Sequence, residues 1–397
     1  MRSLASRISV MSGEGALSVF ARAQELERQG RSIIHLELGE PDFHPAPGVI
    51  AAAKQALDEG KDRYCNVRGL PALREEVAVY LRRTRNISVS PENVVIAPGC
   101  KIALFMALMA LLEPHDEVLY PDPGFPGYAS ITLGLGGKPV AFSLAGSNCL
   151  QPDPDEVASK ITAASKILIT NSPGNPTGTV YSDKVQRRLA ELAIEHDLIV
   201  LSDEIYARII FGDEYISMLR YPGMEERTLI IDGFSKSFAM TGWRLGYTVA
   251  PSFIVPALDM LTVNSYTCAA EFTQYAAIEA MRDRERATPR MVAEFARRRD
   301  EFTRDLNRVP GFYCRPAEGA FYAWVDTSDT GMTAEDLCEC MLEEAGVAAI
   351  PGAAFGAQGK AYVRFSFASS IATLKEAVER IMKVSTAWQG TPATTQL

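Results

Sequence analysis

A lysine and an arginine eight residues apart are the side chains in this sequence best suited to chemistry. Lys236 lies in a small, hydroxyl-rich turn after an apolar run, and Arg244 lies just before another apolar run. Burial disfavours the charged form of a lysine, so a buried Lys236 presents a free amine that can hold an aldehyde as an imine. The fixed cation of Arg244 can neutralise a phosphate. The pair predicts a nucleophilic amine with an anion-binding group nearby.

This stretch resembles the signature Ser-Lys-x-x-x-x-x-Gly-x-Arg of the class I and II aminotransferases, which are aspartate aminotransferase-like enzymes of fold type I that use pyridoxal 5'-phosphate. Ser235, Lys236, Gly242 and Arg244 match it, and further matches follow in order from about residue 38 to about residue 366. The resemblance implies that Lys236 forms the Schiff base with the cofactor. It also implies that Ser235 and Arg244 bind the cofactor phosphate.

A second group of matched residues follows the apolar strand expected at residues 94–97. Gly99, Cys100 and Lys101 begin the next helix, where backbone amides and the positive end of the helix dipole favour a phosphate. They fill the position of the family's phosphate-cradling tripeptide. In the proline-rich segment that comes later, the resemblance implies that Phe125 stacks on the pyridine ring. A phenylalanine packed in the core is the alternative.

Polar residues also follow two later strands. Residues 171–178 match the family's Asn-Pro-x-Asn-Pro-Thr-Gly loop, with Ser172 in place of its first proline. The resemblance implies that Asn175 hydrogen-bonds the phenolic oxygen of the cofactor and helps to hold the substrate carboxylate. An acidic residue at the end of a buried strand needs a cationic partner. For Asp203 the resemblance implies the protonated pyridine nitrogen, and it places Tyr206 at the phenolic oxygen.

Three further residues complete the implied site. Gly39 belongs to a turn that would pass beside the substrate carboxylate, and Arg364, in an otherwise apolar strand, suits the α-carboxylate. A structural ion pair is the alternative for Arg364. The resemblance implies that Tyr64 reaches the cofactor phosphate of the neighbouring subunit in a homodimer. A buried tyrosine with one satisfied hydroxyl is the alternative for Tyr64.

The amino-acid composition limits the partners and the cellular compartment that we expect for the protein. The chain has 397 residues, of which 47% are hydrophobic, and a formal net charge of -9 without any block of lysine and arginine. This argues against nucleic acid or an anionic membrane as the main partner. No apolar segment sustains a secretory signal, and seven scattered cysteines suggest reduced thiols in the cytoplasm. Cys338 and Cys340 lack a second ligand pair, so no metal site is expected.

Short apolar strands alternate with helices, which predicts an α/β fold with a mainly parallel sheet covered on both faces. We expect a three-layer α/β/α large domain over residues 48–287 and a smaller α+β domain over residues 288–397. Residues 1–47 are expected to form an N-terminal arm and part of the small domain. The strand that begins at Glu117 is expected to end before Pro121.

The predicted reaction is a ping-pong transamination between an L-amino acid and a 2-oxo acid. Lys236 would act as the general base at the α-carbon, and Asp203 would keep the ring nitrogen protonated. The same motifs leave open a lyase, a cyclase or another amino-acid-modifying enzyme that uses this cofactor. Gly233 departs from the family, which often has a serine there. No motif supplies a second arginine for a side-chain carboxylate, so the amino donor stays undecided.

Overall fold

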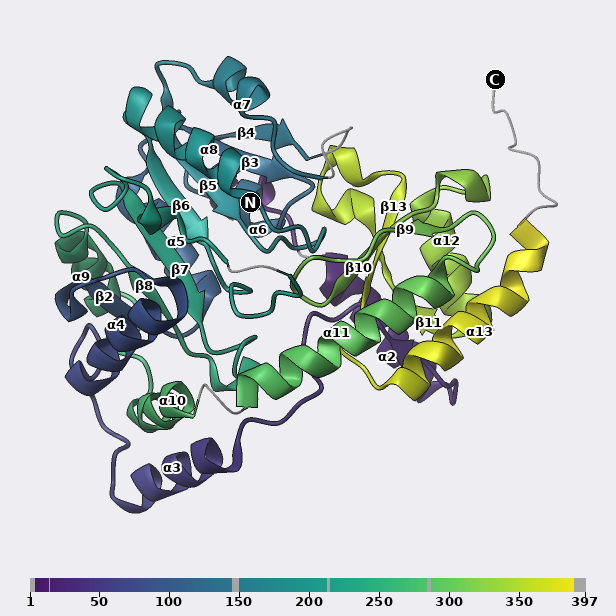
Figure 1. Cartoon of the computed structure of the whole chain (residues 1–397), viewed down its shortest axis with the longest axis horizontal. Coiled ribbons are helices and arrows are strands. Elements are labelled where there is room, and N and C mark those ends of the chain that lie inside the picture. The colour runs from purple at the N-terminus through teal and green to yellow at the C-terminus, as the bar shows by residue number, and fades with distance from the viewer. Residues whose placement is uncertain (1–3, 14, 145–149, 213–214, 284–286, 389–397) are drawn as a thin grey trace.

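A seven-stranded sheet forms the centre of the protein in the computed structural model, which describes residues 4–13, 15–144, 150–212, 215–283 and 287–388 (Figure 1). Strand β8 runs antiparallel to both of its neighbours, and the other adjacent pairs are parallel. In spatial order the strands are β2 (Val94–Ala97), β8 (Gly246–Val249), β7 (Thr228–Gly233), β6 (Ile199–Asp203), β5 (Ser165–Asn171), β3 (Glu117–Asp122) and β4 (Lys138–Ser143). The prediction of a mainly parallel sheet is confirmed.

Helices cover both faces of this sheet because its strands carry apolar side chains on both sides. Ile169 and Leu201 pack with α5 and α9 on one face, whereas Leu168 and Val200 pack with α8 on the other. The helices of this region are α3 (Pro47–Asp58), α4 (Pro71–Arg85), α5 (Cys100–Leu111), α6 (Gly127–Gly134), α7 (Pro154–Lys160), α8 (Asp183–Glu195), α9 (Val255–Val263) and α10 (Glu271–Arg282). The result is the expected three-layer arrangement (Figure 1).

A second, antiparallel sheet lies beside the first and is built mainly from the last third of the chain (Figure 1). Phe295 and Phe302 of α11 pack on Phe321 and Phe365 of this region. Its strands, in order, are β12 (Ile350–Pro351), β13 (Tyr362–Ser366), β10 (Tyr322–Asp326) and β9 (Tyr313–Cys314). Its helices are α11 (Ala287–Leu306), α12 (Ala334–Cys340) and α13 (Ile371–Trp388).

The N-terminal segment joins this second region. Strand β1 (Ile34–His35) pairs in parallel with β11 (Val347–Ala348), and helix α2 (Gly15–Arg28) precedes it. A further helix, α1 (Ser6–Ser9), lies near the start of the chain. These two strands form a separate two-stranded sheet, and the residues after β1 pass toward the larger sheet.

The expected end of β3 is wrong by two residues. The strand continues through Pro121 and Asp122, which pair with Phe142 and Ser143 of β4. Pairing with β5 on the other side stops at Leu119. A proline lacks the N–H that a ladder needs, but it is tolerated where only one side of the strand is paired.

The carboxyl ends of the central strands converge on one edge of the sheet. Asn171 ends β5, Asp203 ends β6 and Gly233 ends β7. Ligands in open α/β sheets bind outside this edge. Within the residues described above, no helix is both long enough and apolar enough to cross a lipid bilayer.

Candidate active site

A cavity of about 320 Å³ opens at this edge and lies between the two sheets. Its size falls within the usual range of small-molecule sites, about 300–1,000 Å³. The residues predicted from the sequence that line it are Gly39, Cys100, Lys101, Phe125, Asn175, Asp203, Tyr206, Ser235, Lys236, Arg244 and Arg364. Segments far apart in the sequence therefore meet around one space.

Lys236 is the nucleophile candidate of this cavity. Burial lowers the pKa of its ammonium group to about 8, although the nearby Cys100 acts in the opposite direction. The amine donates a hydrogen bond to the carbonyl oxygen of Gly39. A lysine with this pKa is partly neutral near physiological pH and can attack a carbonyl carbon.

Asp203 is the buried acid of the cavity. Burial raises the pKa of its carboxyl group to about 6, and a hydrogen bond from Tyr128 partly offsets the effect. Tyr128 Oη donates to Asp203 Oδ2 over 2.7 Å, and Asn171 Nδ2 donates to the Asp203 carbonyl oxygen over 3.1 Å. A carboxylate held in this way favours a cationic partner inside the cavity.

Arg364 brings a buried cation to the side of the cavity formed by the smaller sheet. Its Nη1 donates to Asn175 Oδ1 over 2.8 Å and its Nη2 donates to the Glu37 carbonyl oxygen over 2.5 Å. Its guanidinium carbon lies 4.4 Å from the centre of the Tyr322 ring. The Tyr322 hydroxyl in turn lies 2.7 Å from the Tyr206 hydroxyl. The fork of Arg364 is thus fixed in a geometry that suits a carboxylate.

An anion cradle lies at the start of α5. No side chain caps this helix, and its first residues, Cys100 and Lys101, line the cavity beside Ser235 and Arg244. Gly99 adopts a φ of 100°, and a β-carbon there would lie 2.5 Å from the Arg244 guanidinium. Only glycine therefore allows Arg244 to approach the helix start. These groups fit a phosphate.

The presence of glycine at position 233, where the family often has a serine, has a steric reason. A β-carbon at this position would lie 2.7 Å from the Cys100 sulfur and 2.7 Å from Gly246 Cα. The Cys100 side chain thus occupies the space into which a serine would project. The phosphate cradle must therefore rely on Ser235, Arg244 and the helix start.

The structure separates two predicted residues from the cavity wall and adds several that the sequence analysis missed. Gly99 lies behind Arg244, and Tyr64 is 86% exposed on the surface. Tyr128 lies in the same proline-rich segment as Phe125, but no motif distinguishes it as a cavity residue. Tyr322 neighbours Arg364 only through the pairing of β10 with β13, and that pairing could not be read from either strand alone.

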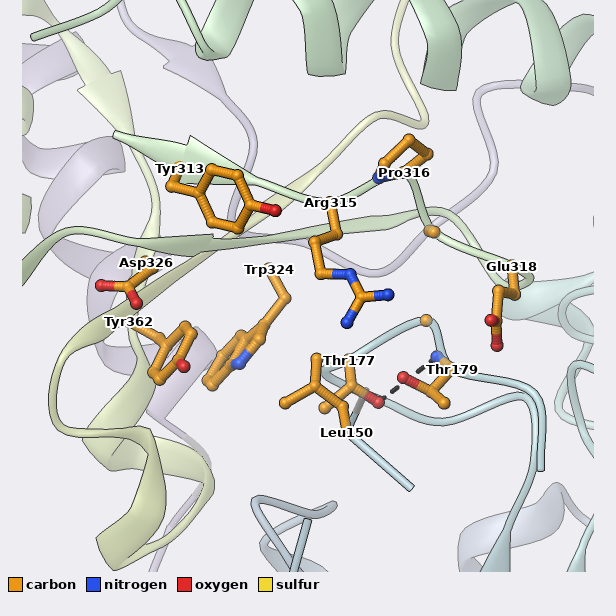
Figure 2. Close-up of a pocket in the computed structure, with 12 residues that line it drawn as sticks. Leu150, Thr177, Thr179, Tyr313, Arg315, Pro316, Glu318, Trp324, Asp326 and Tyr362 are labelled. Atoms are coloured by element: carbon orange, nitrogen blue, oxygen red, sulfur yellow. Dashed lines mark hydrogen bonds between the residues drawn. The ribbon is translucent and has the colours of Figure 1, made fainter. Parts of the chain in front are cut away.

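A smaller cavity, of about 150 Å³, lies beside the loop that carries Asn175 (Figure 2). In Figure 2, Arg315 projects between Trp324 and Thr177. The backbone amides of Glu318 and Gly319 both donate to the carbonyl oxygen of Gly178, over 3.0 and 2.8 Å. These bonds attach the loop to the region of the smaller sheet.

Comparison with known proteins gives a consistent answer. Residues 31–381 match the family model "Aminotransferase class I and II". An aspartate aminotransferase of Pyrococcus abyssi is 41% identical over 358 residues, which cover 89% of this chain and 92% of that protein. The aromatic-amino-acid aminotransferase 2 of Thermococcus litoralis is 37% identical over 96% of this chain and 98% of its own length.

A solved structure extends the likeness to three dimensions. The aspartate aminotransferase of Thermus thermophilus with maleate has a TM-score of 0.92 and 38% identity, covering 97% of this chain and 100% of that one. The chain belongs to the class I and II aminotransferases. This aminotransferase moves an amino group between an amino acid and a 2-oxo acid, as its sequence predicted. Its family depends on pyridoxal phosphate.

The crowding at Gly39 generates a prediction for the aminotransferase. In Gly39→Ala the new β-carbon would overlap the Tyr322 hydroxyl, so Tyr322 or the Gly39 backbone must shift away from the cavity. We expect kcat/KM to fall about 100-fold, as misplacement of active-site groups by about 1 Å can do. Gly13→Ala is the control because a β-carbon there meets nothing within 4 Å. Equal activities of the two variants in a steady-state assay would contradict the prediction.

Proposed function

We propose that this chain binds pyridoxal 5'-phosphate in the 320 Å³ cavity and uses it to transfer the amino group of an L-amino acid to a 2-oxo acid. One observation carries the proposal: a buried lysine with a pKa of about 8 and a buried aspartate line the same cavity as two arginines. Such a set offers an amine for an aldehyde, an acid for a ring nitrogen and cations for a phosphate and a carboxylate.

Each part of the cofactor has a partner of matching chemistry. The phosphate would be held by Ser235, Arg244 and the amides of Cys100 and Lys101 at the uncapped start of α5. Four residues of the cavity wall would make the remaining contacts. Phe125 would stack on the ring and Asp203 would pair with the ring nitrogen. Tyr206 and Asn175 would hydrogen-bond the phenolic oxygen.

When bound, pyridoxal phosphate supplies an aldehyde for the amino group and a conjugated ring that accepts electrons from the substrate. Lys236 would hold the cofactor covalently and, once displaced by the substrate, would move the proton at the substrate α-carbon. Arg364 would orient the substrate by its α-carboxylate. Asp203 would hold the proton of the ring nitrogen in place.

We propose an amino donor with a second carboxylate, such as aspartate. Lys101 lines the cavity, and its Nζ lies 5.7 Å from the centre of the Phe125 ring. Its side chain can therefore meet an anionic substrate side chain while its backbone amide faces the phosphate. The names of the Pyrococcus abyssi and Thermus thermophilus relatives support this donor, as does maleate, a dicarboxylate, in the latter structure.

An aromatic donor is the second candidate. Ala16, Leu17 and Leu38 give the same cavity an apolar wall next to the substrate position. An aromatic side chain would be buried against it. The name of the Thermococcus litoralis relative supports this candidate.

We also propose a homodimer in which Tyr64 reaches the phosphate site of the partner subunit. Tyr64 is accessible for contact with a second copy of the chain, since 86% of its surface faces solvent. A broad hollow of about 890 Å³, lined by Pro41, Phe43 and Trp243, adjoins the active-site cavity and would be covered by the second copy. Both cavities share Leu38 and Glu40.

The first test concerns Lys236. Adding pyridoxal phosphate to the cofactor-free protein should produce a visible absorption band, and borohydride should then fix the cofactor on Lys236 in a peptide mass map. The band should form faster as the pH rises through about 8, because only the neutral amine attacks. Lys236→Ala should lose both the band and turnover, whereas Lys138→Ala, an exposed lysine, should keep them. Label on a different lysine would refute the assignment.

The second test separates the two donors. In Lys101→Met we expect KM for aspartate to rise about 10- to 100-fold, the worth of a hydrogen bond to a charged group. KM for phenylalanine should stay within about threefold, since an aromatic ring needs no cation. Lys138→Met serves as the control in the same steady-state assay. An equal loss with both donors would show that Lys101 does not recognise the side-chain carboxylate.

The third test addresses the dimer. Light scattering should give twice the 43.3 kDa mass of the chain. Tyr64→Phe should weaken pyridoxal phosphate binding about tenfold, because one hydrogen bond to a charged phosphate is lost. Tyr313→Phe, another exposed tyrosine, should bind the cofactor normally. A monomeric mass, or full affinity in Tyr64→Phe, would exclude this arrangement.

A further inference from the structure

A buried arginine joins two buried carboxylates beneath the cavity. Arg85, the last residue of α4, is 1% exposed, and Glu204 and Asp232 are 0% and 2% exposed. Arg85 Nη1 lies 2.5 Å from Glu204 Oε2, and its Nη2 donates to Asp232 Oδ2. None of these three residues lines the cavity. The catalytic roles proposed above do not use them.

Both carboxylates have further donors. Glu204 Oε1 accepts hydrogen bonds from Ser202 over 3.1 Å and from Ser217 over 2.6 Å. Asp232 accepts from the Tyr247 hydroxyl over 2.7 Å and from the Gly233 amide over 2.6 Å. Donors on every side stabilise the ionised form of a buried carboxylate. Each oxygen of the two carboxylates therefore accepts at least one hydrogen bond.

The cluster lies directly behind two groups of the site. Glu204 follows Asp203 at the end of β6, and its amide donates to the Ile231 carbonyl oxygen of β7 over 2.9 Å. Asp232 lies near the end of β7, four residues before Lys236. Arg85 thus joins the ends of the two strands that lead to the buried acid and to the nucleophile.

The charges of the cluster do not cancel. One guanidinium faces two carboxylates, which leaves one net negative charge next to Asp203. The other titratable groups around Asp203 are Tyr128 from α6, Cys100 from α5 and Tyr206. Burial is the main reason that the pKa of Asp203 is raised, and both cluster carboxylates act in the same direction. Arg85 is the cation that these two buried carboxylates share.

We propose that Arg85, Glu204 and Asp232 are positioning residues for the transamination: Arg85 pairs with both carboxylates, and the negative charge that it leaves unbalanced holds the proton that Asp203 shares with the cofactor ring nitrogen. The inference rests on the proposed binding of pyridoxal phosphate. It assigns the cluster an electrostatic task in addition to its packing. A buried ion pair contributes little to stability by itself, because desolvation offsets its Coulomb energy.

The experiment measures the affinity of the protein for pyridoxal phosphate as a function of pH, from the visible absorption band. In the wild-type protein the affinity should fall as the pH drops through about 6, because Asp203 then takes up its own proton. Asp232→Asn and Glu204→Gln each remove one negative charge, so the pKa of Asp203 should fall. We expect the acid midpoint to move down by about 1 pH unit in each variant. Titration of the cofactor itself is common to all proteins compared, so the difference between midpoints reports on Asp203.

Two controls separate charge from packing. Arg85→Lys keeps the cation and should keep the wild-type midpoint. Glu117→Gln removes a buried carboxylate, 5% exposed, at the first residue of β3, which lies at the end of the strand away from the cavity. This variant should leave the midpoint unchanged. Lower melting temperatures for Asp232→Asn and Glu204→Gln with unmoved midpoints would overturn the inference and leave a structural cluster. Failure of the wild-type protein to develop the band would instead refute the proposed function.

Discussion

Burial of ionisable groups is the physical constraint on which this structure depends. A charge taken out of water is costly unless hydrogen bonds or an opposite charge replace its hydration. The proposed reaction requires a neutral amine at Lys236 and an ionised acid at Asp203 in the same cavity. Their pKa values, about 8 and about 6, come from the same burial acting on groups of opposite charge. The surrounding framework must therefore supply partners that keep each group in the required state.

The parallel sheet can supply such partners because the carboxyl ends of its strands lie at one edge. Side chains and backbone groups just beyond β5, β6 and β7 lie within hydrogen-bond reach of one another, as Asn171 and Asp203 illustrate. The smaller sheet supplies Arg364 and Tyr322 from two paired strands. In the proposed site the larger sheet would hold the cofactor, while the smaller one would bring the cation for the substrate carboxylate.

The sequence was sufficient to predict the fold class, the family and most of the cavity wall. These predictions depend on local features, namely a lysine in a polar turn, an acid after an apolar strand and a glycine before a helix. Arg85 could not be found in this way. It lies in a helix end with Arg82 and Arg83, which resembles a solvated surface, and its partners are 119 and 147 residues away. The choice of Tyr128 as the donor to Asp203 likewise depends on packing. The division into residues 48–287 and 288–397 stays a prediction.

The attachment of Gly178 to Glu318 and Gly319 has a mechanical consequence. The loop from Gly174 to Thr179 is closed by its own hydrogen bonds, and Asn175 within it is bonded to Arg364. The loop follows a strand of the larger sheet, yet it is tied to the smaller one at two points. Asn175 N also donates to Asn171 Oδ1 at the end of β5 over 2.9 Å, so Asn175 is bonded to both sheets. The Arg364 guanidinium is thus connected through Asn175 and Asn171 to the backbone of Asp203, and a shift of the smaller sheet would be transmitted to the buried acid.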